Sequence, residues 1–381
     1  MSESATARAN QRIVLIIPTM DRGGAERQVC LLAAGLLRQQ VDVHVVLLTA
    51  GGARMTELAE AGVPTTLIGK RGKFDPTAYF RLKRKLRDLA PDVVHTFLFA
   101  ANSYGRQAAR AAGVPVIIGS ERCVDLWKTW RHAVIDRRLA RCSQAITTNS
   151  SGVVDFYRQR GIPSELFRVI PNAIPDSLAR PAITRDQLAA SLGIDASRKW
   201  IIAVGRLWPQ KRYRDLIWAA EMMNTLRGDD TTLIIIGDGP QRGELQRFRD
   251  AVSNAGRVVF AGQREDVASL LPLADAFWLA SGYEGQSNAL MEAMQAGLPC
   301  IVSDIPGNRD LIVHDETGAL VQLGETADFA RQTQHVWTHP QMAADLGRNA
   351  ANLIAEQFTV SKMVAAHVAL YQELSLAASR A

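Results

Sequence analysis

Short apolar runs alternate with helical segments along most of this 381-residue chain, and this alternation limits the fold more than any other feature. Two parallel strands need a crossover, usually a helix, so a repeated strand–helix order predicts parallel sheets covered on both faces. Right-handed crossovers then give doubly wound, Rossmann-like domains. In the first half we expect seven strands: Ile13–Ile17, Val43–Leu48, Thr65–Ile68, Val93–His95, Val116–Ile118, Ala145–Thr148 and Arg168–Ile170.

The alternation pauses at Pro171–Asn172 and again through Pro175–Arg198, which we interpret as an interdomain connection. The pattern therefore predicts an N-terminal domain over residues 1–173, with residues 1–10 a disordered polar tail, and a C-terminal domain over 174–358. A helix over 359–381 follows, with packing on the first domain as one option. In the second domain we expect six strands: Trp200–Val204, Thr232–Ile236, Val258–Phe260, Ala276–Leu279, Cys300–Val302 and Ala319–Val321.

Charge is distributed unevenly between these domains. Residues 1–173 hold 25 Lys and Arg against 14 Asp and Glu, a formal charge of +11, whereas the remainder holds 19 against 24, a charge of −5. A basic half indicates an anionic partner, which could be a phospholipid, a lipid-linked pyrophosphate or nucleic acid. Nucleic acid is disfavoured because aromatic residues do not interleave with the basic ones. The basic segment Arg81–Arg87 and the group Arg131–Arg141 favour docking on an anionic membrane surface, although solvated charged faces would look the same.

Cysteine use and hydropathy indicate the compartment. The four cysteines form no CxxC pair, which argues against a zinc site or a disulfide framework and suits a reducing environment. No apolar run reaches the roughly 18 residues of a spanning helix, and the start lacks the apolar core of a signal peptide. We expect a cytoplasmic protein that is peripheral to the inner face of a membrane.

Two loops after strands are suited to bind phosphate. The first contains Gly23 and Gly24 and opens the first helix, whose N-terminal N–H groups favour an anion; a plain tight turn is the alternative. The second, starting at Gly205, carries Arg206 and Lys211 beyond the first strand of the second domain. Ligands of open α/β sheets bind at that edge, so two cations there could hold a diphosphate; a solvated basic loop is the alternative.

The segment from Ser281 to Gly297 is the strongest candidate. Glu284 lies in a glycine-flanked loop, and Glu292 lies about two turns along the helix that follows. Two carboxylates so placed could accept hydrogen bonds from the hydroxyls of a sugar and a ribose. The amides of Gln286, Ser287 and Asn288 could meet a phosphate between them. The alternative is that Glu284 caps the helix and Glu292 is a surface residue.

Other strand ends are less informative. His95 ends a predicted strand, where a ligand would be met, but a lone histidine is more often structural. We expect the turns Gly237–Pro240 and Ser303–Asp310 to have mainly a structural role.

Taken together, five segments in this order resemble glycosyltransferase family 4, the retaining enzymes with the GT-B fold. They are Gly-Gly-Ala-Glu-Arg at 23–27, Ile-Pro-Asn at 170–172, Gly-Arg-Leu followed by Lys over 205–211, Gly-Asp-Gly-Pro at 237–240, and the Glu-x7-Glu segment that ends in Ala-Gly-Leu-Pro at 296–299.

The resemblance implies two Rossmann-like domains with an interdomain cleft, and sugar transfer from a nucleotide-diphosphate donor, with UDP as the expected nucleotide, to a glycan or lipid-linked acceptor. It implies no metal and no cofactor, because an Arg/Lys pair and helix N-termini would stabilise the leaving diphosphate. By the same resemblance, Arg206, Lys211 and Glu284 are the catalytic candidates, and Gly24, Gly205, Gln286, Ser287, Asn288 and Glu292 bind the donor.

This chain departs from the family at two positions. Asp310 stands where a glutamate is common, and the loop after the fifth strand carries Arg122 where many members have a histidine. Arg122 could take over a contact to the acceptor or sugar, as could His95. Two other functions stay open: a UDP-sugar epimerase of the same fold, and a non-catalytic subunit that binds sugar nucleotides.

Overall fold

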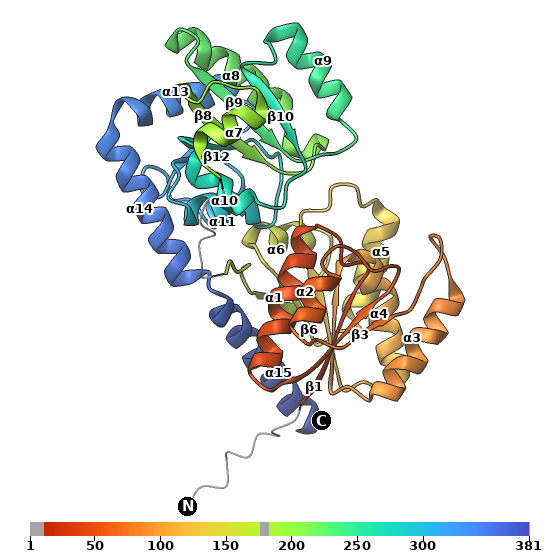
Figure 1. Cartoon of the computed structure of the whole chain (residues 1–381). Coiled ribbons are helices and arrows are strands. Elements are labelled where there is room, and N and C mark those ends of the chain that lie inside the picture. Colours follow the sequence, from red (N-terminus) through yellow and green to blue (C-terminus); the bar gives the residue numbers. More distant parts are fainter. Residues whose placement is uncertain (1–10, 176–182, 381) are drawn as a thin grey trace, which may run out of the picture. The chain divides into compact units, whose positions relative to one another are not determined.

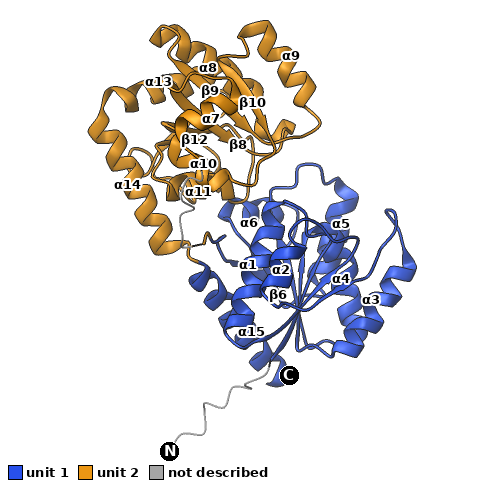
Figure 2. Ribbon diagram, in the orientation of Figure 1, with its two compact units in different colours: residues 1–173, 360–381 blue, residues 174–359 orange. Residues whose placement is uncertain are grey.

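The computed structural model describes residues 11–175 and 183–380 and divides into two compact units (Figures 1 and 2). Unit 1 comprises residues 1–173 with 360–381, and unit 2 comprises 174–359. The predicted polar tail, residues 1–10, lies outside the described residues.

Unit 1 is built on a parallel sheet of seven strands in the order β3-β2-β1-β4-β5-β6-β7. The order reverses beside β1, where Ile13 pairs with Val43 on one side and Val93 on the other. This is the doubly wound arrangement that the strand–helix alternation predicts. All seven expected strands are present: β1 Arg12–Ile17, β2 Asp42–Leu47, β3 Thr65–Leu67, β4 Val93–Phe97, β5 Val116–Glu121, β6 Ala145–Thr148 and β7 Phe167–Val169.

The helices of unit 1 begin and end at the expected kinds of residue. Asp75 caps α3 by accepting the Ala78 N–H at 3.0 Å, and Pro76 is the first helical residue. Gly113, in the left-handed region, ends α4. The helices are α1 Gly24–Arg38, α2 Met55–Glu60, α3 Pro76–Leu89, α4 Leu98–Ala112, α5 Trp130–Ala140, α6 Ser151–Arg158, the short 3-10 helix η1 Ser164–Leu166, and α15 Val360–Arg380.

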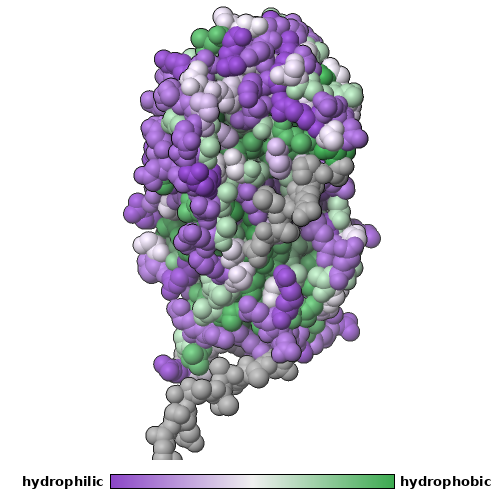
Figure 3. Space-filling model, turned by 60° about the vertical axis from the view of Figure 1, so that its left-hand side comes forward, coloured by the Kyte–Doolittle hydropathy of each residue, from purple (hydrophilic) through white to green (hydrophobic). Residues whose placement is uncertain are grey.

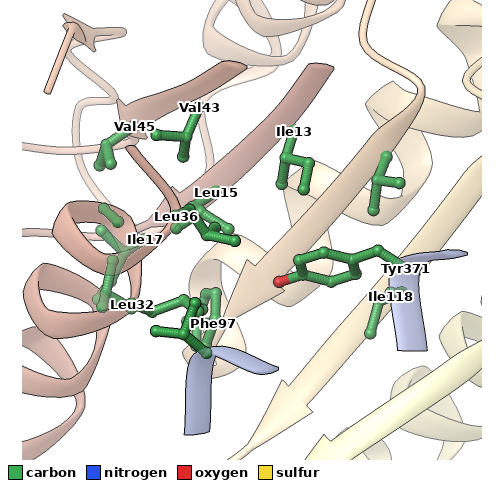
Figure 4. Close-up of a cluster of buried hydrophobic side chains, with 14 of the residues drawn as sticks. Ile13, Leu15, Ile17, Leu32, Leu36, Val43, Val45, Phe97, Ile118 and Tyr371 are labelled. Atoms are coloured by element: carbon green, nitrogen blue, oxygen red, sulfur yellow. The ribbon is translucent and has the colours of Figure 1, made fainter. Parts of the chain in front are cut away.

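The C-terminal helix α15 is part of the core of unit 1, although more than 180 residues separate it from β7. Met363, Val364 and Tyr371 are buried in a cluster with residues of β1 and α1 (Figure 4). A Cβ on Gly35 of α1 would lie 2.3 Å from Val364 Cγ2, so only glycine permits this approach. The chain therefore returns to its first unit to complete the hydrophobic core.

Unit 2 holds a parallel sheet of six strands in the order β10-β9-β8-β11-β12-β13. Alternate residues of β8 face opposite sides: Trp200 and Ile202 join one cluster, and Ile201 and Ala203 join the other. Both faces of the sheet are thus covered. All six expected strands are present: β8 Lys199–Val204, β9 Thr231–Ile236, β10 Val258–Gly262, β11 Ala276–Leu279, β12 Cys300–Ser303 and β13 Ala319–Val321.

The interpretation of 175–198 as a plain connection was wrong in part, because it contains helix α7. Thr184 and Gln187 form a capping box, and Leu188 is buried in the core of unit 2. The other helices of unit 2 are η2 Pro209–Lys211, α8 Tyr213–Arg227, α9 Arg242–Val252, α10 Val267–Leu270, η3 Leu271–Leu273, α11 Asn288–Gln295, α12 Pro306–Arg309, α13 Thr326–Thr338 and α14 Pro340–Gln357, and α7 itself spans Arg185–Leu192.

Hydrophilic residues predominate at the surface of each unit on the face that Figure 3 displays. Within residues 11–175 and 183–380, we find no helix with the length and apolarity needed to cross a bilayer.

Candidate functional site

The loop that follows β8 turns at Gly205 and carries Lys211 back over that turn. Gly205 has a φ of +154°, and a Cβ there would lie 3.0 Å from Lys211 Cε. The hydroxyl of Tyr213, the first residue of α8, donates a hydrogen bond to the Gly205 carbonyl at 2.9 Å. Glycine is needed here because the lysine stem lies directly against the backbone.

Lys211 and Glu284 lie together at the carboxyl edge of the unit 2 sheet. Lys211 Nζ is 2.5 Å from Glu284 Oε1, and the same oxygen accepts a hydrogen bond from Ser281 Oγ at 2.8 Å. The two side chains are only 14% and 10% exposed. An ion pair with so little solvent interacts more strongly than one on the surface. Two charges that the sequence separates by 73 residues therefore form one polar group.

Hydrogen bonds to two backbone carbonyls hold the two loops in register. Gln210 Nε2 donates to the Tyr283 carbonyl at 2.7 Å, and the Gly282 N–H donates to the Gln210 carbonyl at 2.8 Å. Gln210 precedes Lys211, and Tyr283 precedes Glu284. The loops thus fix the ion pair from both sides. The sequence pattern assigns no role to Gln210, Ser281 or Tyr213, and their contacts add all three to the candidate site.

Helix α11 starts directly after this loop. Ser287 caps it, because its side chain accepts the Leu290 N–H at 3.4 Å. Glu292 lies on the helix and is only 9% exposed. The alternative in which Glu284 caps the helix and Glu292 is a surface residue is therefore wrong. Gln286 and Ser287 are also buried, at 8% and 5% exposure.

Arg206 differs from Lys211 in its surroundings. Its side chain is exposed, and its guanidinium carbon lies 5.2 Å from the centre of the Trp208 ring, within the range of a cation–π contact. Among the described residues it forms no ion pair. Arg206 is therefore a cation that the protein orients but does not neutralise.

Neighbouring turns pack backbone against backbone around these loops. A Cβ on Gly237, after β9, would lie 2.0 Å from the Gly205 carbonyl oxygen. A Cβ on Gly307, after β12, would lie 1.8 Å from the Gly285 carbonyl oxygen. The turns interpreted as scaffold thus set the position of the loops that carry Lys211 and Glu284.

The remaining candidates belong to unit 1. Gly24 is the first residue of α1, after the cap Gly23. A Cβ on Gly23 would lie 1.9 Å from Glu26 Oε2, so the glutamate folds over the turn at the helix start. Gln28 of the same helix exchanges two hydrogen bonds with the backbone of Ala173. These bonds fix α1 to the last residue of the 1–173 segment of unit 1.

His95 is a core residue, which argues against the expected contact to sugar or acceptor. Strand β4 runs on to Phe97, so His95 is not at its end, and the side chain has no exposed surface. Its Nδ1 pairs with the Tyr371 hydroxyl at 2.8 Å, and its Nε2 pairs with Thr147 Oγ1 at 2.9 Å. His95 therefore has a structural role, which is the more frequent role of a lone histidine.

Two buried histidines make unit 1 sensitive to acid. Burial lowers the pKa of His95 well below its usual value, and burial lowers the pKa of His367 to about 4. Both histidines are neutral in the folded state and bind protons more readily in the unfolded state. Their contribution to the free energy of unfolding is therefore complete above about pH 6.5 and is lost as the pH falls toward 4. We expect the urea midpoint of unfolding to fall over this range. His367→Leu should flatten the fall, whereas His335→Gln, at an exposed position of unit 2, should leave it unchanged; equal slopes in all three proteins would contradict the assignment.

Arg122 sits directly after β5, where its guanidinium donates to Asn172 Oδ1. Burial lowers the pKa of Arg122 to about 10, so the residue stays cationic at neutral pH. A buried network next to it holds this loop: Lys128 Nζ lies 3.3 Å from Glu121 Oε2 and 3.0 Å from Asp136 Oδ2. No sequence pattern points to this network, since its members come from separate elements.

The described residues bring no three His, Cys, Asp or Glu side chains together as metal ligands. That the reaction needs neither metal nor cofactor stays a prediction.

Two family models match this chain in turn. Residues 23–173 match a glycosyl transferase 4-like domain, and residues 184–353 match the glycosyl transferases group 1. Together they cover most of the sequence and include the Lys211 and Glu284 loops. The chain belongs to the group 1 glycosyltransferases. It is therefore an enzyme of the hexosyltransferase type.

This glycosyltransferase is similar in sequence to a galactosyltransferase and to a glucosaminyl L-malate synthase. It is 29% identical over 301 residues to an Escherichia coli UDP-Gal:alpha-D-GlcNAc-diphosphoundecaprenol alpha-1,3-galactosyltransferase, which covers 76% of this chain and 77% of the relative. It is 28% identical over 235 residues to a Bacillus anthracis N-acetyl-alpha-D-glucosaminyl L-malate synthase, over 61% of this chain and 60% of that one.

Solved structures establish the fold of the glycosyltransferase as GT-B. Anabaena HepE in complex with UDP matches with a TM-score of 0.83 at 21% identity, over 95% of this chain and 100% of HepE. A sucrose-phosphate synthase from Thermosynechococcus elongatus matches with a TM-score of 0.78 at 18% identity, over 96% and 100%. The prediction of two Rossmann-like, doubly wound domains is confirmed.

Proposed function

We propose that this glycosyltransferase moves a sugar from a UDP-sugar, with retention of configuration, to a glycan or lipid-linked acceptor in the synthesis of a cell-surface polysaccharide or glycolipid. The observation that carries this proposal is the Lys211–Glu284 pair beside the start of α11. The pair brings together, at one point of the sheet edge, a cation that could bind phosphate and a carboxylate that could accept hydrogen bonds from hydroxyls. The UDP-galactose in the name of the Escherichia coli relative and the UDP bound in HepE support the choice of nucleotide.

The positive charges act on the leaving group. As the bond between the sugar and the diphosphate breaks, negative charge builds on the phosphate oxygens. Lys211 as a point charge, Arg206 through its fork and the N–H groups of Gln286, Ser287 and Asn288 would stabilise that charge, which is electrostatic catalysis by groups already in position.

Glu284 and Glu292 then hold the two sugars of the donor. Glu284 would accept hydrogen bonds from hydroxyls of the transferred sugar while Lys211 and Ser281 keep its carboxylate in place. Glu292, on α11, would accept from the ribose. The acceptor oxygen would attack on the face that the diphosphate leaves, and the departing phosphate would take its proton, so no carboxylate nucleophile is needed.

Unit 1 would hold the acceptor, with Arg122 contributing a cation and Gly24, at the start of α1, lying against a phosphate or the acceptor. The excess of basic residues in this unit supports attachment to the cytoplasmic face of an anionic membrane. A lipid-linked acceptor would then meet the enzyme at the surface in which it is anchored.

A thermal-shift panel of UDP-, GDP- and ADP-sugars tests the donor. A ligand that binds only the folded protein adds RT ln(1 + [L]/Kd) to the free energy of unfolding and so raises the melting temperature. We expect UDP-sugars to raise the melting temperature most. Glu292→Gln should weaken the shift because it removes the ribose acceptor. A larger shift with GDP- or ADP-sugars would overturn the choice of UDP.

Product analysis separates transfer from the epimerase alternative. Incubation with a UDP-sugar and a membrane extract should yield free UDP and a labelled glycan or lipid. Interconversion of UDP-sugars without release of UDP would show that the protein is an isomerase of the same fold.

A further inference from the structure

A groove of about 770 Å³ crosses the outer surface of unit 1 between helices α3, α4 and α5. These helices lie side by side on one face of the sheet (Figure 1). Three arginines line the groove, Arg110 from α4, Arg138 from α5 and Arg141 directly after it. No carboxylate is among the lining residues, and none of the three arginines forms an ion pair within the part of the chain that the structure describes. The groove therefore concentrates positive charge that the protein leaves uncompensated.

Most of the remaining lining is apolar, and Gln107 of α4 is a neutral polar residue within it. Tyr79 of α3 and Ile135 and Leu139 of α5 form walls between the arginines, and Ile135 is 38% exposed. Arg110 Nη1 donates to Cys142 Sγ, another residue of the lining, at 3.4 Å. A site of this kind suits a ligand that is anionic at one end and apolar beside it.

Two large aromatic side chains are exposed on the same helices. Phe80, next to Tyr79 on α3, is 65% exposed, and Trp130, the first residue of α5, is 72% exposed. Arg131 lies with its guanidinium carbon 5.4 Å from the centre of the Trp130 ring. Exposed tryptophan beside arginine is typical of surfaces that enter the headgroup layer of a membrane.

We propose that the groove binds the phosphate headgroup of an anionic phospholipid and that the α3–α5 face docks unit 1 on the membrane. A small soluble anion would engage the arginines but would leave the Phe80 and Trp130 rings exposed to water, which is why the lipid is favoured. This inference rests on the proposed function only in its choice of membrane, since it names the surface that would bring the enzyme to a lipid-linked acceptor.

The test compares two full-length double variants that lose the same charge. Arg110→Gln/Arg138→Gln removes two arginines of the groove. Arg38→Gln/Arg380→Gln removes two exposed arginines from α1 and α15, the helices that pack together in another core cluster of unit 1. Co-sedimentation is measured with phosphatidylcholine vesicles, with and without phosphatidylglycerol.

We expect the native protein and the α1/α15 variant to bind the vesicles with phosphatidylglycerol and to bind pure phosphatidylcholine weakly. The groove variant should bind the anionic vesicles about thirtyfold more weakly, on the scale of about fivefold for each cation at an anionic surface. Equal losses in both variants, or unchanged binding of the groove variant, would overturn the proposal.

The thermal shift by UDP-sugars is measured on the same proteins. Because this shift depends on unit 2, it tests the proposed donor separately from the proposed docking groove. A groove variant that keeps the shift but loses vesicle binding supports the docking surface. If vesicle binding depends on the groove but no nucleotide-sugar raises the melting temperature, the donor assignment is overturned and the docking proposal stands. Phe80→Ser/Trp130→Ser should also weaken vesicle binding while the shift by UDP-sugars stays; full retention of vesicle binding would count against a membrane as the occupant.

Discussion

Replacing Lys211 by alanine is expected to lower kcat for sugar transfer by about 10² to 10³, the range seen when one preorganised donor to a developing negative charge is removed. The Lys211 side chain is only 14% exposed, so water that enters after its removal would stabilise the leaving group less than the charge does. The measurement is the initial rate of UDP release with a lipid or glycan acceptor at saturating donor.

Controls separate this effect from damage to the fold. Lys211→Ala leaves the Glu284 carboxylate with Ser281 as its described partner, which itself destabilises a largely buried charge. The double variant Lys211→Ala/Glu284→Gln removes both charges and should recover stability but not rate. Lys199→Ala breaks an exposed ion pair with Asp275 in the same unit and should keep nearly full activity. If Lys211→Ala performs like Lys199→Ala, the lysine has no part in stabilising the leaving group.

Replacing Gly307 by alanine should damage both stability and activity. The added Cβ would lie 1.8 Å from the Gly285 carbonyl oxygen and 2.9 Å from that of Glu284, and backbone cannot turn aside as a flexible side chain can. We expect a loss of about 2 kcal/mol or more in the free energy of unfolding, toward the upper end for overpacking. A displaced Gly285 would also move Glu284 away from Lys211, and a shift of about 1 Å in a site can cost roughly 10²-fold in rate.

Gly243→Ala is the matched control for this prediction. Gly243 lies on α9 of the same unit, and the atom nearest to a Cβ there would be Nη1 of the flexible Arg247 side chain, at 3.6 Å. Alanine in a helix is expected to be neutral or to stabilise by about 0.5–1 kcal/mol. Thermal denaturation and the rate of UDP release report the two effects. A Gly307→Ala protein with native melting temperature and rate would mean that the 284–287 loop moves at little cost.

Local patterning predicted the secondary structure well. Strand β8, with Trp200–Val204 as an apolar run, could be expected from the sequence because strands buried on both faces are apolar along their length. Helix α7 was missed although its capping box, Thr184 and Gln187, was visible, because the Pro and Ala content around it suggested a linker. The apolar run predicts a strand that ends at His95, whereas β4 continues through Thr96 to Phe97.

The sequence by itself determined the order of the strands and helices, the family, and which charged residues follow the strands of unit 2. These depend on periodicity and on short segments, which are local properties of the chain. Only the tertiary structure decided that Lys211 contacts Glu284, that Ser287 and not Glu284 caps α11, and that Tyr371 of the last helix closes the core over His95. Those contacts join residues far apart along the chain, or depend on which side chain reaches a given N–H, and the packing of loops and sheets settles both.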